Sequence, residues 1–331
     1  MMNFCTYFDS YYILKGLALY DSLCNTCGDD FHLYICAFDD ESYKKLNSLQ
    51  LRNVTVDSLS EVETDALLKV KPTRTKAEYC WTCGPSVIYH ILMKYQLSDI
   101  TYLDSDLFFM TSPKVIFDEI GDNSIGITEH FFEKQSIEGR FCVQYVYFKN
   151  DDEGLDALTW WRDRCIEWCF CRYEDGKYGD QKYLEQFPVR YKKVSIITNR
   201  GVGIAPWNMN LYSYSDNTLT HQGIEYTFVF FHFHGVTTEL IDYELTLRLR
   251  DVVIENKRVV DLFMLPYMDA IKQVYENYLE KSNLKTRFVE MSLVSRLWRQ
   301  TKRMFRNNSI AQFFYYKVFS VRFGGREVKK L

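Results

Sequence analysis

The sequence lacks the short motifs that mark three large classes of α/β enzyme. No G-x-G-x-x-G follows the first predicted strand, which argues against a dehydrogenase-type dinucleotide site. No G-x-x-x-x-G-K-[ST] is present, which argues against a P-loop enzyme. No G-x-S-x-G is present, which argues against an α/β-hydrolase. The chain also has no internal repeats and no low-complexity linker.

Long apolar runs are missing as well. The start, MMNFCTYFDSYY, has no basic region followed by an apolar stretch, so we expect no signal peptide. The most apolar late segment, IAQFFYYKVFSV, is too short to cross a bilayer. We therefore expect a cytoplasmic protein, with peripheral attachment to the inner face of the membrane as an open alternative.

The cysteines do not indicate a disulfide framework. The ten cysteines include CNTC (Cys24, Cys27) and CWTC (Cys80, Cys83), and two such pairs can form a zinc site. Both pairs lie in segments patterned as helices, however, and no export signal precedes them. We expect reduced thiols in the core rather than zinc ligands or disulfides.

What the sequence does contain is an alternation of strand-like and helix-like segments. The predicted strands are 3–8, 31–38, 54–59, 100–109, 124–130, 142–148 and 227–235, and the predicted helices are 11–23, 40–49, 78–95, 155–172 and 179–187, the last capped by Asp180. This order predicts an α/β protein with a parallel sheet and helices on both faces. With 331 residues, 47% of them hydrophobic, we expect one large domain, 1–260, and a helical extension, 261–331.

The C-terminal extension differs in charge from the rest of the chain. Residues 281–331 hold thirteen Lys or Arg and two Glu, a net +11, and since the whole chain carries −4 the remainder carries −15. Segment 296–323 mixes basic and aromatic residues and has the pattern of a basic amphipathic helix. Two partners suit such a tail: an anionic membrane surface, or the acidic surface of the catalytic body.

Two carboxylates, Asp104 and Asp106, stand at the end of an apolar strand in YLDSDLFF. Ligands of open α/β sheets bind beyond the carboxyl ends of the strands, and strand alternation would aim both acids the same way. A hard divalent cation between them could bridge to a diphosphate. The alternative is a polar turn whose acids cap the next helix.

Three further segments favour a site. In FVFFHFHGV, His232 at a strand end suits a third metal ligand, although surface or core histidines are the alternative. GDQKYL places polar groups at a helix start, where the alternative is an ordinary N-cap. NRGVGIAPWNM suggests a shaped loop beside a pocket, or else a rigid turn with a buried tryptophan.

These segments, in this order, resemble the GT-A glycosyltransferases, and glycosyltransferase family 8 with its bacterial relatives in particular. The resemblance covers about residues 3–236 and rests on YLDSD, FCVQYVYFKN, GDQKYL and HFHG. It implies a GT-A fold and a manganese (or magnesium) ion held by Asp104, Asp106 and His232. It also implies that His234 lies beside a phosphate of the donor.

The same resemblance implies roles for five more residues. The D-Q pair of the family matches Asp180 and Gln181, which would lie by the reactive face of the sugar. The end of the first strand would hold the base and ribose of the nucleotide, which corresponds to Tyr7, Asp9 and Tyr12.

The sequence departs from the family pattern at three places. The helix before D-x-D lacks the expected Arg, although Arg74 and Lys76 lie upstream. The F-N-x-G segment reads FCVQ, so Cys142 replaces Asn and Gln144 replaces Gly. The Lys-Pro-Trp expected after H-x-x-G is replaced by Val236, Thr237 and Thr238. These departures bear on the donor and on the stereochemistry of transfer.

The resulting hypothesis is a metal-dependent glycosyltransferase. The expected donor is a nucleotide sugar, with UDP as the nucleotide, and the expected acceptor is a hydroxyl of a glycan or of a lipid-linked sugar; no nucleic-acid partner is expected. Transfer with retention is expected, with inversion by Asp180 as general base as the alternative. Two hypotheses from different functional classes stay open beside it: a sugar nucleotidyltransferase and a non-enzymatic membrane scaffold.

Overall fold

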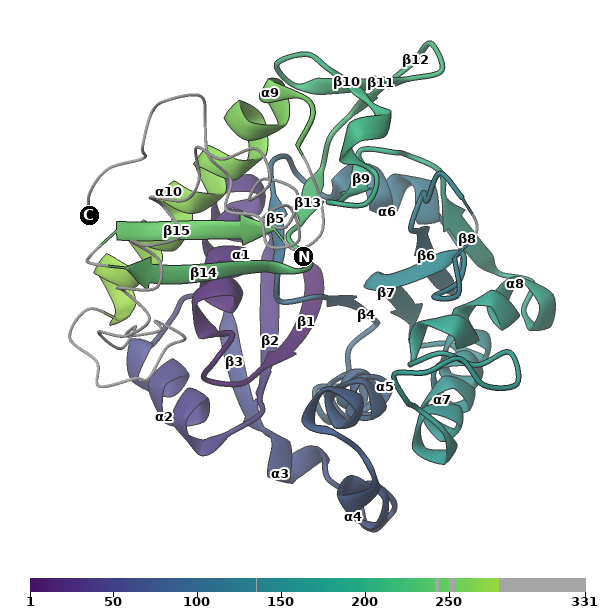
Figure 1. Ribbon diagram of the computed structural model, residues 1–331. Coiled ribbons are helices and arrows are strands. Elements are labelled where there is room, and N and C mark those ends of the chain that lie inside the picture. The colour runs from purple at the N-terminus through teal and green to yellow at the C-terminus, as the bar shows by residue number, and fades with distance from the viewer. Residues whose placement is uncertain (135, 242–243, 250–253, 280–331) are drawn as a thin grey trace, which may run out of the picture. The chain divides into compact units, whose positions relative to one another are not determined.

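The computed structural model describes residues 1–134, 136–241, 244–249 and 254–279 (Figure 1). The chain divides into two compact units, Met1–His232 and Phe233–Leu331. The division expected near residue 260 remains a prediction. Within the described residues, no helix combines the length and the apolar character needed to span a membrane.

The first unit is built on a seven-stranded sheet (Figure 1). Its strands are, in spatial order, β3 (Val54–Ser58), β2 (Phe31–Ala37), β1 (Met2–Phe8), β4 (Asp99–Leu103), β7 (Phe141–Lys149), β6 (Ile125–Glu129) and β8 (Val194–Ile197). Strands β3, β2, β1 and β4 run parallel to one another, and β6 and β8 run parallel to each other. Strand β7 is antiparallel to both β4 and β6. The predicted α/β architecture with a mostly parallel central sheet is confirmed.

Helices cover both faces of this sheet because successive strand residues point to opposite sides. Cys5 of β1 belongs to the core that includes α5 (Lys76–Lys94) and α7 (Asp152–Glu167), which lie side by side (Figure 1). Phe8 of the same strand faces α1 (Ile13–Cys27), where it lies against Gly16. Phe4 packs against Phe117 of α6 (Lys114–Ile120), with ring centroids 6.1 Å apart. A fully buried phenylalanine contributes about 1.5–3 kcal/mol to folding, and such residues lie on both faces, Phe4 on one and Phe148 in the core that contains Cys5, so both faces stabilise the sheet.

A second, three-stranded sheet adjoins the end of β4. It consists of β5 (Leu107–Phe109), β13 (Phe230–His232) and β9 (Val202–Ile204), with β13 in the middle. Strand β13 is antiparallel to β5 and parallel to β9. The remaining elements of this unit are α2 (Asp40–Leu49), α3 (Leu59–Val62), α4 (Asp65–Val70), α8 (Phe187–Arg190), the strands β10 (Ser213–Tyr214), β11 (Thr218–His221) and β12 (Ile224–Thr227), and 3-10 turns at Lys71–Thr73, Gln181–Gln186 and Met209–Leu211.

Local details differ from the predictions in three places. The strand predicted over 100–109 is broken, since β4 ends at Leu103 and β5 begins at Leu107. The helix predicted over 179–187 is a 3-10 helix followed by α8, and the side chain of Asp180 makes no capping hydrogen bond to it. The helix predicted over 155–172 ends at Glu167. The ten cysteines are free thiols, and six of them are buried, as predicted for core residues.

The second unit begins with an antiparallel pair of strands that the sequence patterns did not predict. Strand β14 (Val236–Ile241) pairs with β15 (Glu244–Leu249). Helical structure follows in α9 (Lys257–Val259), a π-helical stretch at Val260–Met264, α10 (Leu265–Val274) and a second π-helical stretch at Tyr275–Leu279, which agrees with the helical prediction for 261–279. The basic amphipathic segment predicted at 296–323 lies outside the described residues.

Candidate functional site

Three predicted ligands converge where the seven-stranded sheet meets the small sheet of β5, β13 and β9. Asp104 and Asp106 lie in the turn between β4 and β5, and His232 ends β13 in register with Leu107. His232 Nε2 lies 3.4 Å from Asp104 Oδ2 and 3.1 Å from Asp106 Oδ1. His232 and Asp106 are buried, and Asp104 is partly buried. Strand pairing therefore joins residues more than 120 positions apart in one cluster.

The two acids reach this cluster by a turn and not by strand alternation. The N–H of Leu107 donates to the carbonyl of Asp104 at 3.1 Å, which closes the turn. The N–H of Asp104 donates to the carbonyl of Gln144 in β7 at 2.9 Å, which ties the turn to the central sheet. The predicted common direction of the two carboxylates is correct, but the predicted reason for it is wrong.

Each of the three side chains is held by a partner from a different element. Tyr102 Oη donates to Asp104 Oδ1 at 2.7 Å, Lys15 Nζ donates to Asp106 Oδ2 at 3.3 Å, and His232 Nδ1 lies 2.8 Å from Gln144 Oε1. In each side chain, one polar atom contacts this partner and the other polar atom faces the cluster. The atoms that face one another are two carboxylate oxygens and one imidazole nitrogen.

The electrostatics of the cluster are those of crowded, buried acids. Burial raises the pKa of Asp104; the adjacent His232 lowers it and the adjacent carboxylate of Asp106 raises it, and the pKa ends above its usual value. Burial, followed by the charge of Asp104, raises the pKa of Asp180 to about 7. A cation among these groups would lower the pKa of both Asp104 and Asp180, because it favours the ionised form of each acid.

Asp180 and Gln181 lie at the start of the 3-10 helix Gln181–Gln186. Asp180 is 5% exposed, and its carbonyl accepts a hydrogen bond from Trp161 Nε1 of α7 at 2.9 Å. The negative charge of Asp104, a member of the three-residue cluster, acts on the carboxyl group of Asp180 and raises its pKa. Gln181 is partly buried. Their predicted place beside the reactive face of a sugar remains a prediction.

The residues predicted to hold the nucleotide lie at the end of β1 and the start of α1. Tyr7 is stacked between Phe38 and Tyr102, with ring centroids 4.8 and 5.2 Å away. Since Tyr102 also donates to Asp104, this aromatic stack leads directly to the acid cluster. Tyr12 precedes α1 and is 39% exposed.

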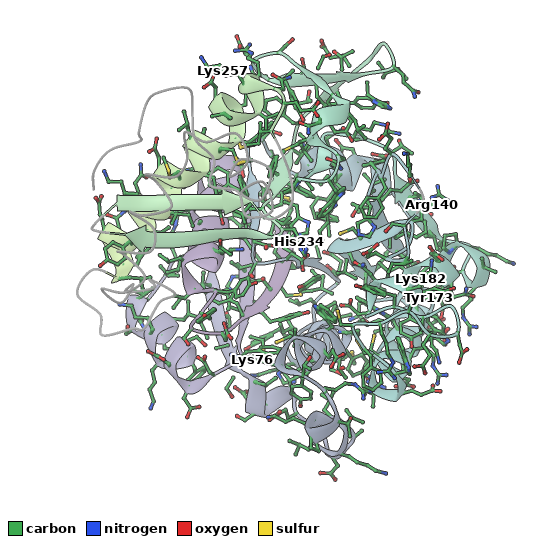
Figure 2. All side chains as sticks on the ribbon, viewed as in Figure 1. Lys76, Arg140, Tyr173, Lys182, His234 and Lys257 are labelled. Atoms are coloured by element: carbon green, nitrogen blue, oxygen red, sulfur yellow. The ribbon has the colours of Figure 1, made fainter. Side chains whose placement is uncertain are left out.

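Asp9, the third of these residues, is engaged within the protein. Its Oδ1 accepts from the backbone N–H groups of Tyr11 and Tyr12 at 3.0 and 3.2 Å. Its Oδ2 pairs at 2.5 Å with Lys76, which is labelled in Figure 2 at the start of α5. His234, also labelled, is an exposed residue of the second unit (Figure 2). Contact of Asp9 with a base and of His234 with a phosphate remain predictions.

Two residues at the cluster were not assigned a role from the sequence. Lys15 is 8% exposed and its ammonium lies over the ring of Tyr12, 4.8 Å from the centroid, beside Asp106. Its signal was a single charge inside the apolar helix YYILKGLALY. Gln144 was noticed only as a departure from the family motif, because nothing local shows that its side chain meets a histidine 88 residues later.

A second group of potential ligands lies elsewhere in the same unit. Asp57, Glu61 and His90 bring their polar atoms close together, but Lys94 Nζ already lies 2.8 Å from Asp57 Oδ1 and 2.6 Å from Glu61 Oε2. Burial raises the pKa of Asp57, yet hydrogen bonds from His90, Lys94 and Tyr95 outweigh it and hold the pKa at about 2. This group is a hydrogen-bonded ion-pair network that joins α5 to β3.

Comparison with known proteins places the chain in a family. No protein-family model matches the sequence. The Bacillus subtilis (strain 168) protein YfnD is 32% identical over 281 residues, which cover 82% of this chain and 89% of YfnD. The chain belongs to the same family as YfnD. YfnF of the same organism is 32% identical over 246 residues, which cover 70% of this chain and 80% of YfnF, and both proteins are described as uncharacterized.

Solved structures identify the fold of this member of the YfnD family. The galactosyltransferase LgtC, in complex with donor and acceptor sugar analogs, matches with a TM-score of 0.53 at 12% identity over 82% of this chain and 96% of LgtC. An active-site mutant of LgtC matches with a TM-score of 0.50 at 14% identity over 79% and 95%. The predicted GT-A glycosyltransferase fold is confirmed.

Proposed function

We propose that this protein is a metal-dependent glycosyltransferase that moves a sugar from a nucleoside diphosphate to a hydroxyl group. The observation that carries the proposal is the convergence of Asp104 Oδ2, Asp106 Oδ1 and His232 Nε2 in a GT-A fold. Two carboxylate oxygens with one imidazole nitrogen form a donor set suited to Mn²⁺, with Mg²⁺ as the alternative. A bound divalent ion would offset the charge that develops on the leaving diphosphate.

The charges around the cluster support a cationic ligand. Asp104, Asp106 and Asp180 are carboxyl groups in a mostly buried environment, and Lys15 forms an ion pair with Asp106. Burying like charges together is unfavourable unless a cation compensates them. The protein keeps these acids in place through Tyr102, Lys15 and Gln144, so the site is organised for a cation before one binds.

The donor is proposed to be a UDP-sugar and the acceptor a glycan or a lipid-linked sugar. The support is the resemblance of the D-x-D, D-Q and H-x-x-G segments to glycosyltransferase family 8. Both faces of Tyr7 are covered by Phe38 and Tyr102, so the surface proposed for stacking of a base is the ring of Tyr12, which is 39% exposed and is connected to the acid cluster through Lys15. The tail, if it binds anionic lipid, would suit a lipid-linked acceptor.

Retention at the anomeric carbon is the proposed outcome, with Gln181 at the donor face. One observation favours inversion as the second candidate. The pKa of Asp180, raised by burial and by Asp104 to about 7, suits a general base that takes the proton of an acceptor hydroxyl near neutral pH. Retention needs no such base, so the anomeric configuration of the product, read by NMR, separates the two.

The first test is release of nucleoside diphosphate from a panel of nucleotide sugars, with Mn²⁺ or with excess EDTA. We expect release from at least one UDP-sugar that is faster with Mn²⁺ and is lost in EDTA. Asp57→Asn serves as the control for a buried acid outside the cluster, and it should keep the metal dependence. If no nucleotide sugar is cleaved, or if cleavage is equally fast in EDTA, the proposed function is wrong.

A further inference from the structure

We infer that Gln144 is a positioning residue that determines which nitrogen of His232 faces Asp104 and Asp106. The inference deepens the proposed function, because it rests on His232 acting as a metal ligand. Gln144 Oε1 lies 2.8 Å from His232 Nδ1, and the two side chains are 0% and 2% exposed. Because both residues are buried, the contact is shielded from water, and this hydrogen bond decides which imidazole nitrogen carries the proton.

A neutral imidazole carries one N–H and one lone pair, and its neighbours decide which nitrogen has which. An amide oxygen can only accept, so a bond to Gln144 Oε1 requires His232 Nδ1 to be the donor. In the neutral imidazole the lone pair then lies on Nε2, the atom 3.1 Å from Asp106 Oδ1 and 3.4 Å from Asp104 Oδ2. These two carboxylates by themselves favour a proton on Nε2, and the bond to Gln144 opposes them. A metal ligand needs this tautomer, because the coordinating nitrogen must be unprotonated.

The orientation of the Gln144 amide is supported by a chain of hydrogen bonds. The hydroxyl of Thr128 donates to the carbonyl of Cys142 at 3.4 Å, and a carbonyl can only accept. The oxygen of Thr128 therefore receives Gln144 Nε2–H, also at 3.4 Å. The amide oxygen is thereby turned to His232. Donation runs in one direction from the imidazole through the amide to the backbone of β7.

The space for this amide is made by a glycine in the neighbouring small sheet. Gly203 of β9 has φ +94°, a conformation that residues with a side chain rarely adopt. A Cβ atom at this position would lie 2.3 Å from Gln144 Nε2. The carbonyl of Gln144 also accepts from the N–H of Asp104 at 2.9 Å, so one residue holds both the acid turn and the histidine.

The test is the affinity of the full-length protein for Mn²⁺ alone, measured by titration calorimetry. Gln144→Met keeps the length of the side chain and removes the acceptor, whereas Gln144→Glu keeps an acceptor oxygen for the same Nδ1–H. We expect Gln144→Met to weaken Mn²⁺ binding by about 10–100-fold, the usual effect of losing such a partner. We expect Gln144→Glu to bind within about threefold of wild type or more tightly, since it adds a negative charge.

A second readout reports the tautomer directly. Long-range ¹H–¹⁵N spectra of the metal-free protein at alkaline pH distinguish an imidazole protonated on Nδ1 from one protonated on Nε2. The His232 signal is identified by its loss in His232→Gln. We expect Nδ1–H in wild type and in Gln144→Glu, and Nε2–H in Gln144→Met. A role in packing alone would leave the tautomer unchanged.

The outcomes separate this inference from the proposed function. If wild type binds no Mn²⁺, both are wrong. If wild type binds Mn²⁺ and folded Gln144→Met binds it equally well, or if the Met and Glu variants lose affinity equally, the inference alone is wrong. Should Gln144→Met fail to fold, Thr128→Val decides, because it removes the support of the amide without touching His232. Weaker Mn²⁺ binding by Thr128→Val supports the inference, and unchanged binding overturns it.

Discussion

The ammonium nitrogen of Lys15 lies 3.3 Å from Asp106 Oδ2, and the two side chains are 10% and 12% exposed. This pair joins the first helix of the chain to the acid turn 91 residues later. The same carboxylate offers its other oxygen to His232. Lys15 therefore balances part of the negative charge of the cluster, and a bound divalent ion would balance more of it.

This relationship predicts that Lys15→Met is destabilised most when metal is absent. Removing one partner of a buried ion pair leaves the other uncompensated, and we expect a loss of about 3–5 kcal/mol in the free energy of unfolding in EDTA. Mn²⁺ should restore more stability to this variant than it adds to wild type. Urea unfolding with and without Mn²⁺ measures both effects.

Lys76→Met is the matched control for Lys15→Met. Lys76 pairs with Asp9, but its side chain is 76% exposed, and exposed pairs contribute about 0–1 kcal/mol. We expect this variant to resemble wild type in EDTA. Equal unfolding free energies for the two lysine variants would show that Lys15 does not compensate the cluster.

The proposed metal ligands give a prediction on rate. Asp106→Ala and His232→Ala should each lower turnover about a thousandfold or more, because a three-residue site that loses one ligand cannot hold the cation that stabilises the leaving diphosphate. Circular dichroism should show that both variants are folded, and Asp57→Asn should keep its turnover. Wild-type rates for either folded ligand variant would remove that residue from the site.

Asp180 gives a prediction on pH. Its pKa is raised to about 7 in the folded protein, by burial first and then by Asp104, from an ordinary value of 3.8. The folded state therefore loses stability relative to the unfolded state as pH rises from about 4 to about 7. Asp180→Asn cannot ionise, so its free energy of unfolding lacks this pH dependence. The margin, which is the unfolding free energy of the variant minus that of wild type, should grow by up to about 1.4 kcal/mol per pH unit over that range and then stay constant.

Urea unfolding of wild type and Asp180→Asn in EDTA, between pH 4.5 and 8.5, measures this margin. EDTA is needed because a bound cation beside Asp104 would change the field at Asp180. A margin that is constant from pH 4.5 to 8.5 would mean that Asp180 ionises as an ordinary carboxyl group in the folded protein.

The C-terminal segment 281–331 gives a prediction on membrane binding. Its net charge of +11 should bring the full-length protein down with vesicles of phosphatidylcholine and phosphatidylglycerol at low salt, since each basic residue near an anionic surface contributes roughly 1 kcal/mol. A chain truncated after residue 280 should stay in the supernatant. Equal cosedimentation of the two, or none by the full-length protein, would rule out docking by this segment.

The alternation of strands and helices could be predicted from the sequence because apolar periodicity is a local property. The same holds for Asp104 and Asp106 at a strand end. The pair of strands β14 and β15 was missed, although β14 begins directly after HFHG. The residues of β14, VTTELI, do not alternate cleanly between apolar and polar, whereas those of β15, ELTLRL, do, so β15 carries the period-two signal of a strand and β14 does not.

The sequence by itself determined the fold class, the two acids and the candidate histidine, since these depend on residue type and spacing. Only the tertiary structure decided how they meet: β4 ends at Leu103, the acids lie in a turn, and β13 pairs with β5 so that His232 stands opposite Leu107. It also decided which partners hold them, Lys15 from α1 and Gln144 from β7. The physical reason is that strand pairing and side-chain contacts join residues 88 to 125 positions apart, and local patterns do not record such pairings.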